Sequence, residues 1–328
     1  MQIIEKFKRA LNEAQNILIT THIYPDADGI GSQISLCQAL NEMGKNCICA
    51  NEEKLLDRYK YLDSQNDIYS IDEKKNFQPD LIIVVDTNTP ERTGKKMLAY
   101  YEQQESNYLF IDHHPCSFGD DDRYCIDITA AATGQIIGEI ILDLGITLTK
   151  EMALPLYTAI IIDTSSFRYP TVSHRTHDLV STLFKTGIEP TSAYNGIYGT
   201  KTIKHLHLLG QILSTTKQNK NGDIYWIEFN MEDLSQFNTD IEDTHAFINH
   251  LLILDNIKVA CMIRDHGNVV KVSLRSSGAY DVGIIATQLG GGGHSHSAAT
   301  IIPKDKDIDI IIADTIKKIE KALESLSI

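Results

Sequence analysis

Residues 16–32 read NILITTHIYPDADGIGS: an apolar run, a short acidic loop and the start of a second apolar segment. Residues 16–20 predict a buried strand, and residues 29–43 carry apolar side chains at helical spacing before Gly44, a residue typical of a helix end. A strand, a polar loop and a helix in this order form the repeating unit of an α/β sheet. The same order recurs through the first half of the chain.

Further strands are expected at residues 46–50, 81–86 and 108–111, with helices at residues 91–104 and 131–144. This alternation predicts an α/β fold with a mainly parallel sheet and helices on both faces. After Gly187 the pattern changes to a helix at 201–215, strands at 225–229, 257–264 and 269–276, and helices at 281–289 and 308–323. We therefore expect a catalytic domain at residues 1–190, a linker helix at 191–220 and a smaller mixed α/β domain at 221–328.

Composition and charge limit the classes of function. The net charge of −14, from 44 acidic against 30 basic residues, argues against a protein that grips long duplex nucleic acid. The longest apolar stretch, at residues 153–162, is shorter than the roughly 20 residues of a membrane span, so no membrane partner is expected. The cysteines form no C-x-x-C pair, which predicts reduced thiols and a cytoplasmic protein.

Short segments with acidic residues or histidines follow four of the apolar runs. They read THIYPDAD at residues 21–28, VVD at 84–86, IDHH at 111–114 and IID at 161–163. Ligands of open parallel sheets bind beyond the carboxyl ends of the strands, where the first three segments are expected. Periodicity leaves the run before Asp163 open between helix and strand. A carboxylate at the end of a buried strand or helix costs free energy unless a cation lies beside it. The four segments together therefore predict a pair of divalent metal ions.

The type of side chain indicates which metals would bind. Aspartate oxygens and imidazole nitrogens without thiolates suit Mn²⁺, with Mg²⁺, Co²⁺ or Zn²⁺ as substitutes. Two metals commonly share a bridging carboxylate and a water that serves as the nucleophile. Asp86, alone at the end of a strongly apolar strand, is the expected bridge. Each segment taken singly also fits a helix cap or a surface loop, but their joint occurrence favours metal binding.

The order of these motifs resembles the DHH phosphoesterase superfamily. The matching segments are THxxPDxDGxGS at residues 21–32, VD at 85–86, DHH at 112–114 and DTxxFRY at 163–169. In the second half, SLRS at 273–276, DV at 281–282 and GGGGH at 290–294 are similar to the substrate-binding domain associated with that family. The branch that the chain resembles most consists of two-domain enzymes that degrade very short RNA oligonucleotides and dephosphorylate 3′-phosphoadenosine 5′-phosphate.

The resemblance implies a role for each matching residue in the first half. One metal would be held by His22, Asp26 and Asp86, and the second by Asp28, Asp86, His113 and Asp163. Asp112 would lie outside the metal ligands and orient a histidine. His114 would face the scissile phosphate as a hydrogen-bond or proton donor.

Substrate contacts are expected mainly in the second half. Consecutive amides without side chains make a concave anion site, so the glycine run at residues 290–293 is expected to hold a phosphate. The other interpretation of this run is a helix end at Gly290 followed by a loop. The expected substrate-binding residues are Gly291, Gly292, Gly293, His294, Arg275, Ser276 and Arg168.

These expectations together describe a hydrolase with two Mn²⁺ ions. It would cleave very short RNA oligonucleotides to mononucleotides and remove the 3′-phosphate of 3′-phosphoadenosine 5′-phosphate, with the second domain closing over the substrate. Two other functions stay open: a phosphodiesterase for cyclic di-adenosine monophosphate or its linear dinucleotide, and a nucleotide-binding sensor without catalysis. The expected partners are short RNA oligonucleotides and small nucleotides, and a homodimer is left open.

Overall fold

The computed structural model describes residues 2–63, 68–103, 107–116, 121–239, 241–276, 280–293 and 295–326. The chain divides into two compact units, Met1–Thr200 and Lys201–Ile328. Within the described residues, no helix combines the length and the apolar character needed to cross a membrane.

The first unit is built on a parallel sheet of six strands in the order β3-β2-β1-β4-β5-β6. The strands are β1 (Asn16–Thr20), β2 (Asn46–Asn51), β3 (Ile68–Ser70), β4 (Leu81–Val85), β5 (Asn107–Asp112) and β6 (Tyr124–Ile126). The helices are α1 (Gln2–Asn12), α2 (Ala27–Glu42), α3 (Lys95–Glu102), α4 (Thr133–Asp143), α5 (Lys150–Asp163), α6 (His174–Phe184) and α7 (Pro190–Tyr198). The predicted parallel α/β sheet is confirmed.

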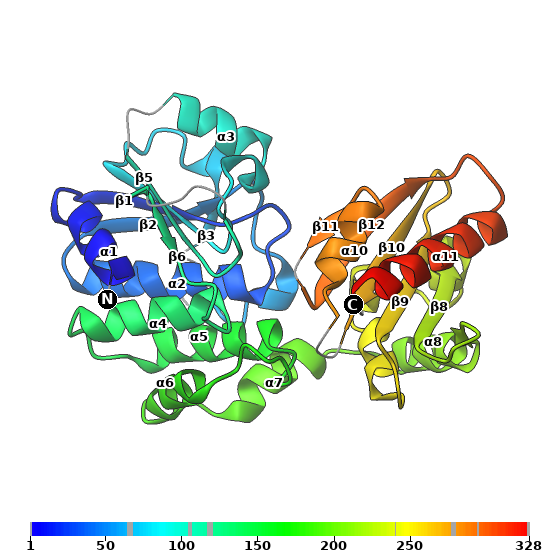
Figure 1. The fold of residues 1–328 in the computed structure, drawn as a ribbon. Helices are drawn as coiled ribbons and strands as arrows, with labels where there is room; N and C mark the ends of the chain where they lie inside the picture. The colour runs from blue at the N-terminus through cyan, green and yellow to red at the C-terminus, as the bar shows by residue number, and fades with distance from the viewer. Residues whose placement is uncertain are drawn as a thin grey trace. The chain divides into compact units, whose positions relative to one another are not determined.

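Alternate residues of the strands belong to two different cores. Ile17 and Ile19 of β1 pack in a core that includes α2, α4 and α5, whereas Leu18 packs in a second core with Met97 of α3. Successive side chains of a strand point to opposite faces, so one apolar strand supplies both cores. Figure 1 shows α2, α4 and α5 on one side of the sheet and α3 on the other. Helices on both faces are therefore confirmed as well.

The apolar run before Asp163 forms helix α5, which settles the choice that periodicity leaves open. This helix packs very closely against α2. A Cβ atom added at Gly31 of α2 would lie 2.4 Å from the carbonyl oxygen of Pro155 in α5, so no larger residue fits there without a shift. The close approach brings the first turn of α2 and the last turn of α5 to the same end of the sheet.

The second unit contains a mixed sheet in the order β11-β12-β10-β9-β8-β7. Among the described strands of this second sheet, only β8 and β9 pair in parallel. Its strands are β7 (Lys217–Gln218), β8 (Ile224–Asn230), β9 (Val259–Asp265), β10 (Val269–Arg275), β11 (Gly292–Gly293) and β12 (Ser297–Pro303). Its helices are α8 (Ile203–Ser214), α9 (Met231–Gln236), α10 (Val282–Gln288) and α11 (Ile308–Leu326). A smaller mixed α/β sheet is thus confirmed, although β11 and β12 were not among the expected strands.

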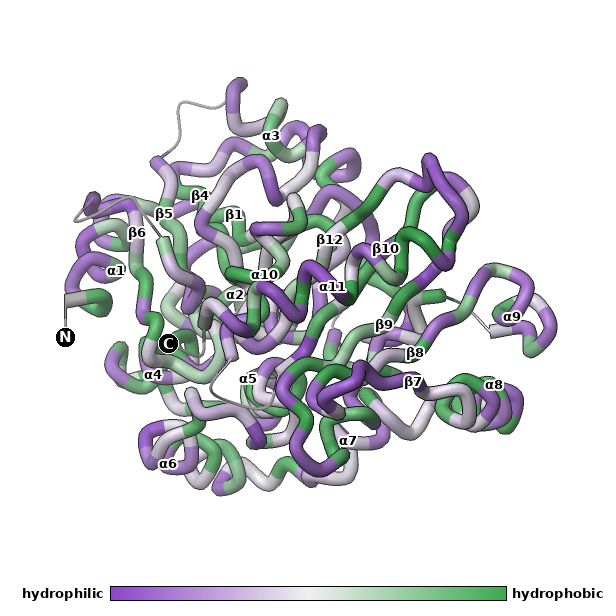
Figure 2. Tube along the Cα trace, turned by 45° about the vertical axis from the view of Figure 1, so that its right-hand side comes forward, coloured by the Kyte–Doolittle hydropathy of each residue, from purple (hydrophilic) through white to green (hydrophobic). Residues whose placement is uncertain are grey.

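The region expected as a linker helix, residues 191–220, contains two helices in different units. Most of α7 lies there, but α7 belongs to the first unit. Leu208 and Ile212 of α8 pack in a core with Ile227 of β8, so α8 is part of the second unit. Along α8 and α11 the colour alternates between hydrophilic and hydrophobic (Figure 2), as expected for helices that bury one face.

Candidate metal centre

Carboxylate and imidazole side chains from the ends of β1, β4, β5 and α5 form three overlapping groups. The ligand atoms within each group lie within 4.8 Å of one another. The groups are His22, Asp26 and Asp86; Asp28, His113 and Asp163; and Asp86, Asp112, His113 and His114. All six residues expected as metal ligands are therefore brought together at the carboxyl edge of the sheet, as open parallel sheets favour.

The ring of His22 is held so that one nitrogen faces the centre of the site. Nδ1 lies 2.9 Å from the carbonyl oxygen of Ile23, which can only accept, so Nδ1 carries the hydrogen of that bond. Nε2 lies 3.4 Å from Oδ2 of Asp86. Burial lowers the pKa of His22, but the hydrogen bond to Asp86 and its charge outweigh burial and raise the pKa to about 9. The Nε2 atom thus needs a cation or a proton between itself and the carboxylate.

Asp26 and Asp28 occupy the start of α2. Oδ1 of Asp26 accepts hydrogen bonds from the amides of Asp28, at 2.9 Å, and Gly29, at 3.4 Å, so Asp26 is the N-cap of this helix as well as a neighbour of His22. The side chain of Asp28 is buried. Burial, followed by the charges of Asp86 and Asp163, raises the pKa of Asp28. A bound divalent cation would favour its charged form.

Asp28 has two partners that the sequence does not reveal. The amide of Thr133 lies 2.8 Å from Oδ2 of Asp28, and the amide of Gly134 lies 2.8 Å from Oδ1. Both amides belong to the first turn of α4, where backbone donors have no partner within their own helix. A Thr-Gly pair at a predicted helix start was the only available signal, and it does not by itself indicate a site.

Asp86 follows the last residue of β4 in a left-handed backbone conformation, with a φ of 61°. Its amide donates to the carbonyl oxygen of Ile111 at 3.0 Å, which fixes this conformation beside β5. The side chain is 3% exposed. Burial raises the pKa of Asp86, but the hydrogen bond and charge of His22 outweigh burial and hold it below the ordinary value. Asp86 belongs to two of the three groups, the one with His22 and Asp26 and the one with Asp112, His113 and His114.

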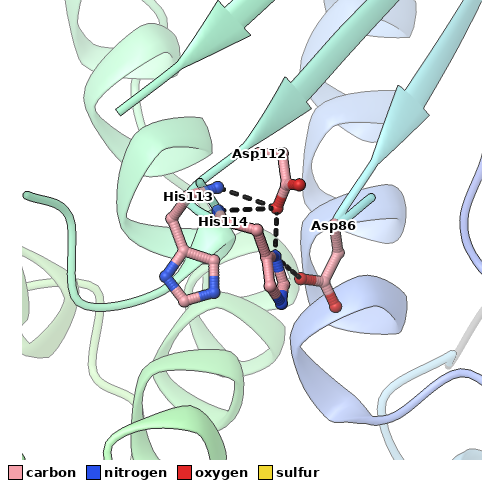
Figure 3. Close-up of side chains that lie close together, drawn as sticks. All are labelled: Asp86, Asp112, His113 and His114. Carbon is pink, nitrogen blue, oxygen red and sulfur yellow. Dashed lines mark hydrogen bonds and ion pairs between the residues drawn. The ribbon is translucent and has the colours of Figure 1, made fainter. Parts of the chain in front are cut away.

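Asp112 organises the two histidines that follow it (Figure 3). Its Oδ1 atom accepts hydrogen bonds from the amides of His113 at 2.8 Å and His114 at 3.2 Å, and from Nδ1 of the His114 ring at 2.5 Å. The second oxygen, Oδ2, is buried and has no hydrogen-bond partner in the described part of the chain. The expectation that Asp112 orients a histidine corresponds to its contact with the His114 ring.

His113 points the other way, toward Asp28 and Asp163. Its Nδ1 atom lies 3.4 Å from the carbonyl oxygen of Ala130, and its Nε2 atom lies 3.2 Å from Oδ2 of Asp163 and 3.9 Å from Oδ2 of Asp28. Burial lowers the pKa of His113, but the charges of Asp28 and Asp86 outweigh it and raise the pKa.

The donor set fits a divalent cation. Several aspartates lie side by side in a largely buried place, and His22 and His113 both direct Nε2 at them while Nδ1 faces a carbonyl oxygen. Oxygen and imidazole ligands of this kind suit Mn²⁺, Mg²⁺ or Zn²⁺. Outer partners that fix the histidine tautomer are typical of metal sites.

Two arginines that follow Asp163 in the sequence are engaged in local contacts. Arg168 donates from Nε to the carbonyl oxygen of Ser165 at 2.9 Å and from Nη2 to the Ser165 hydroxyl at 2.7 Å. Arg175 pairs with Asp127 at 2.6 Å and also with Glu139. The two Arg168 bonds direct its guanidinium to Ser165, and its expected phosphate contact stays a prediction.

The glycine run ends a helix and begins a strand. The amides of Gly290 and Gly291 donate to the carbonyl oxygens of Thr287, at 3.0 Å, and Ala286, at 2.8 Å, which is the Schellman pattern that closes α10. Gly290 has a φ of 83°, as this pattern requires. These two amides are therefore used within the protein, and the interpretation of Gly290 as a helix end accounts for this part of the run.

The next two glycines pair with β12. Gly292 lies opposite Ala299, and Gly293 lies opposite Ala298. A Cβ atom added at Gly293 would lie 2.5 Å from the Cα atom of Ala298, so close strand contact explains this glycine. Gly292 and Gly293 are exposed.

Two further residues expected to bind substrate, Arg275 and Ser276, lie at the end of β10. Arg275 is the last residue of this strand and donates from Nη1 to the carbonyl oxygen of Leu274 at 3.0 Å. Ser276 is buried, and its hydroxyl donates to the carbonyl oxygen of Tyr280 at 2.6 Å, which indicates a role in holding its own loop. His294 lies outside the described residues.

Comparison with known proteins gives related sequences over most of the chain. A bifunctional oligoribonuclease and PAP phosphatase NrnA from Thermus thermophilus is 27% identical over 294 residues, which cover 89% of this chain and 86% of the relative. The cyclic-di-AMP phosphodiesterase PdeA of Listeria monocytogenes is 26% identical over 98% of this chain, but the match covers only 49% of PdeA. The crystal structure of an exopolyphosphatase-related protein from Bacteroides fragilis superposes with a TM-score of 0.86 at 25% identity, covering 98% of this chain and 96% of that one.

Both halves also match described domain families. Residues 16–160 match the DHH family, N-terminal domain, and residues 226–324 match the DHHA1 domain. The first match contains Asp26, Asp28, Asp86 and the Asp112-His113-His114 motif, and the second contains the glycine run. The chain therefore has a DHH-family N-terminal domain followed by a DHHA1 domain, which supports its assignment as a DHH-family phosphoesterase.

Proposed function

We propose that this protein hydrolyses very short RNA oligonucleotides to mononucleotides and removes the 3′-phosphate of 3′-phosphoadenosine 5′-phosphate. The carrying observation is the set of three overlapping ligand groups, two of which contain Asp86 and two of which contain His113. The proposal assigns one divalent ion to His22, Asp26 and Asp86 and a second to Asp28, Asp86, His113 and Asp163, with Mn²⁺ as the preferred metal. The names of the relatives support the choice of substrate.

The side chains of the site are assigned different roles around a bound phosphate. Divalent ions in the two groups would supply Lewis-acid stabilisation of phosphoryl oxygens and an activated water. Asp86 directs Oδ2 toward His22, while Oδ1 lies 3.9 Å from Nδ1 of His114. His114 is oriented by Asp112 through Nδ1, so its Nε2 atom is assigned to the phosphate or the leaving oxygen as a hydrogen-bond or proton donor.

The DHHA1 domain is assigned to the nucleotide part of the substrate. Arg275 is the residue best suited to a phosphate because a guanidinium binds oxyanions through two parallel hydrogen bonds. Gly292 and Gly293 are exposed and bear no side chain, which leaves their backbone accessible. The same proposal includes the release of single nucleotides from the end of an RNA chain. It also includes a cytoplasmic location, because the described cysteines form no disulfide bond.

A phosphodiesterase for cyclic di-adenosine monophosphate is the second candidate, because PdeA is similar to nearly all of this chain. It is less favoured because this chain spans about half of PdeA, whereas it matches most of the oligoribonuclease relative.

Product analysis at fixed Mn²⁺ concentration tests the proposal. The substrates are 3′-phosphoadenosine 5′-phosphate, ribonucleotides of two to five residues, cyclic di-adenosine monophosphate, its linear dinucleotide and pyrophosphate. The RNA length range follows from the small number of contacts expected beyond the site. We expect mononucleotides from the short RNAs and adenosine monophosphate with inorganic phosphate from the first substrate. A larger kcat/KM for the cyclic dinucleotide would replace the proposal with the second candidate. Binding of Mn²⁺ and nucleotide without any product would indicate a sensor.

A further inference from the structure

Thr133 touches two of the proposed metal-ligand carboxylates from one position. It is the first residue of α4 and is buried. Its hydroxyl donates to Oδ1 of Asp86 at 3.2 Å, and its amide donates to Oδ2 of Asp28 at 2.8 Å. These two carboxylates come from different elements, the residue after β4 and the first turn of α2.

The first turn of α4 fixes Asp28 through both of its oxygens. The amide of Gly134 completes the contact that Thr133 begins, at 2.8 Å from Oδ1. The amino end of a helix carries unpaired amides and a partial positive charge, which stabilise a carboxylate there. These contacts hold Asp28 with its Oδ2 atom 3.9 Å from Nε2 of His113, in the group that also contains Asp163.

This contact depends on the absence of a side chain at Gly134. A Cβ atom added there would lie 2.6 Å from the Cβ atom of Ala159 in α5 and 3.3 Å from Oδ1 of Asp28. The first turn of α4 is thus held between Asp28 and the helix that ends at Asp163. Such close packing transmits small displacements, since protein interiors have few voids to absorb them.

The hydroxyl of Thr133 has a different partner from the hydroxyls of two other buried helical threonines, Thr158 and Thr315. Thr158 and Thr315 each donate to the carbonyl oxygen one turn earlier in their own helix, at 2.8 Å and 2.7 Å. Thr133 stands at the helix start and donates instead to Oδ1 of Asp86, whose other oxygen faces Nε2 of His22. One hydroxyl therefore decides which way the carboxylate plane of Asp86 is turned.

We propose that Thr133 is a positioning residue that sets the geometry of the metal centre by orienting Asp86 with its hydroxyl and Asp28 with its amide. This inference rests on the proposed function. It adds that metal affinity depends on a hydroxyl that is itself not a ligand.

The test is calorimetric titration of Mn²⁺ into the full chain and three variants. Thr133→Val keeps the amide and the side-chain shape but removes the hydroxyl, and Thr133→Ser restores it. Thr315→Val removes a buried hydroxyl far along the sequence, in α11, and is the matched control. Loss of a partner just outside the ligands typically weakens metal binding about tenfold to a hundredfold, so we expect a dissociation constant raised about tenfold or more in Thr133→Val. Thr133→Ser and Thr315→Val should bind Mn²⁺ like the parent protein.

The variants separate positioning from a merely structural role. A structural role would lower the melting temperature without changing Mn²⁺ affinity of the folded protein, and Ser would not rescue it. Parental affinity in Thr133→Val, or equal losses in the Ser and Val variants, would overturn the inference while leaving the proposed function intact. If Thr133→Val does not fold, Thr133→Ala is measured in its place with the same expected loss. Absence of Mn²⁺ binding by the parent protein itself would instead overturn the metal centre and the proposed function.

Discussion

Asp112 holds His114 at two points with a single oxygen: Oδ1 accepts hydrogen bonds from the backbone amide and from Nδ1 of the ring. Because a carboxylate oxygen accepts, Nδ1 carries the hydrogen of the ring contact. The tautomer and the direction of Nε2 are fixed together, in the way that a carboxylate orients the histidine of a catalytic triad.

Replacement of Asp112 by Asn should therefore lower kcat more than it changes KM or Mn²⁺ affinity. The amide keeps the shape of the side chain but removes the charge that stabilises a positive imidazole ring. We expect kcat to fall about tenfold to a hundredfold or more. Steady-state kinetics on 3′-phosphoadenosine 5′-phosphate at saturating Mn²⁺ gives the result.

Asp80→Asn is the matched control for this variant. Asp80 also accepts two backbone hydrogen bonds with one oxygen, from the amides of Gln15 and Asn16, but it precedes β4, whereas Asp112 is the last residue of β5. Its replacement should leave kcat unchanged. A parental kcat in Asp112→Asn would remove His114 from the proposed mechanism.

The sequence predicts the bounds of a strand well where the strand is apolar and packs into a core on each face of the sheet. Residues 16–20 are predicted as a strand and form β1 with the same bounds, because an apolar strand followed by a polar loop has few other solutions. Residues 81–86 are predicted as one strand, but β4 ends at Val85. Asp86 leaves the strand conformation because its φ is positive, and that local turn has no sequence signal beyond the aspartate itself.

Other parts of the site depend on tertiary contacts that periodicity does not encode. The run before Asp163 forms a helix that packs against Gly31 of α2, a contact between distant segments. Thr133 and Gly134 act through backbone amides, which every residue except proline carries. The glycine run appears in the sequence as a phosphate site, yet its first two amides close α10. The ligand types are therefore predictable, whereas the groups that hold them are not.

Asp86→Asn should abolish Mn²⁺ binding and turnover while the protein stays folded. The neutral amide cannot hold two cations as a shared carboxylate does, and asparagine tolerates the positive φ at this position better than most residues. Calorimetry and circular dichroism on the same preparation provide both readouts. Turnover within about tenfold of the parent, a loss of less than about 1.4 kcal/mol in transition-state stabilisation, would contradict the bridging role.

Removal of divalent metal should lower the thermal stability of the protein. Buried carboxylates such as Asp28 and Asp86 repel each other without a cation between them. A ligand that binds only the folded state at a hundred times its dissociation constant adds about 2.7 kcal/mol of stability. Differential scanning calorimetry with Mn²⁺ and with EDTA should show a higher melting temperature with the metal. The Asp86→Asn variant serves as control, since Mn²⁺ should not shift its melting temperature.

Gly134→Ala and Gly210→Ala should have opposite effects on stability. The new Cβ atom at residue 134 would meet Ala159 at 2.6 Å, and overpacking of this kind costs about 1–3 kcal/mol. Gly210 is exposed within α8 and has nothing within 4 Å of the added atom, so alanine there should gain about 0.5–1 kcal/mol through helix propensity. Urea denaturation of both variants gives the two free energies of unfolding. Equal stability of Gly134→Ala and the parent would mean that α4 is not tightly held against α5.

Hydrolysis should be fastest for RNA of about two to five nucleotides, because few electrostatic contacts are available beyond the site. The chain carries 44 acidic against 30 basic residues, so longer RNA gains little further attraction from the surface as a whole. Arg175 is already paired with Asp127, and Arg168 donates to Ser165, so both guanidinium groups are engaged in local contacts. Initial rates per molecule for a length series, at one salt and one Mn²⁺ concentration, measure the dependence. Equal or faster cleavage of a much longer unstructured strand would show that the protein has a binding path for RNA beyond the residues assigned to its substrate.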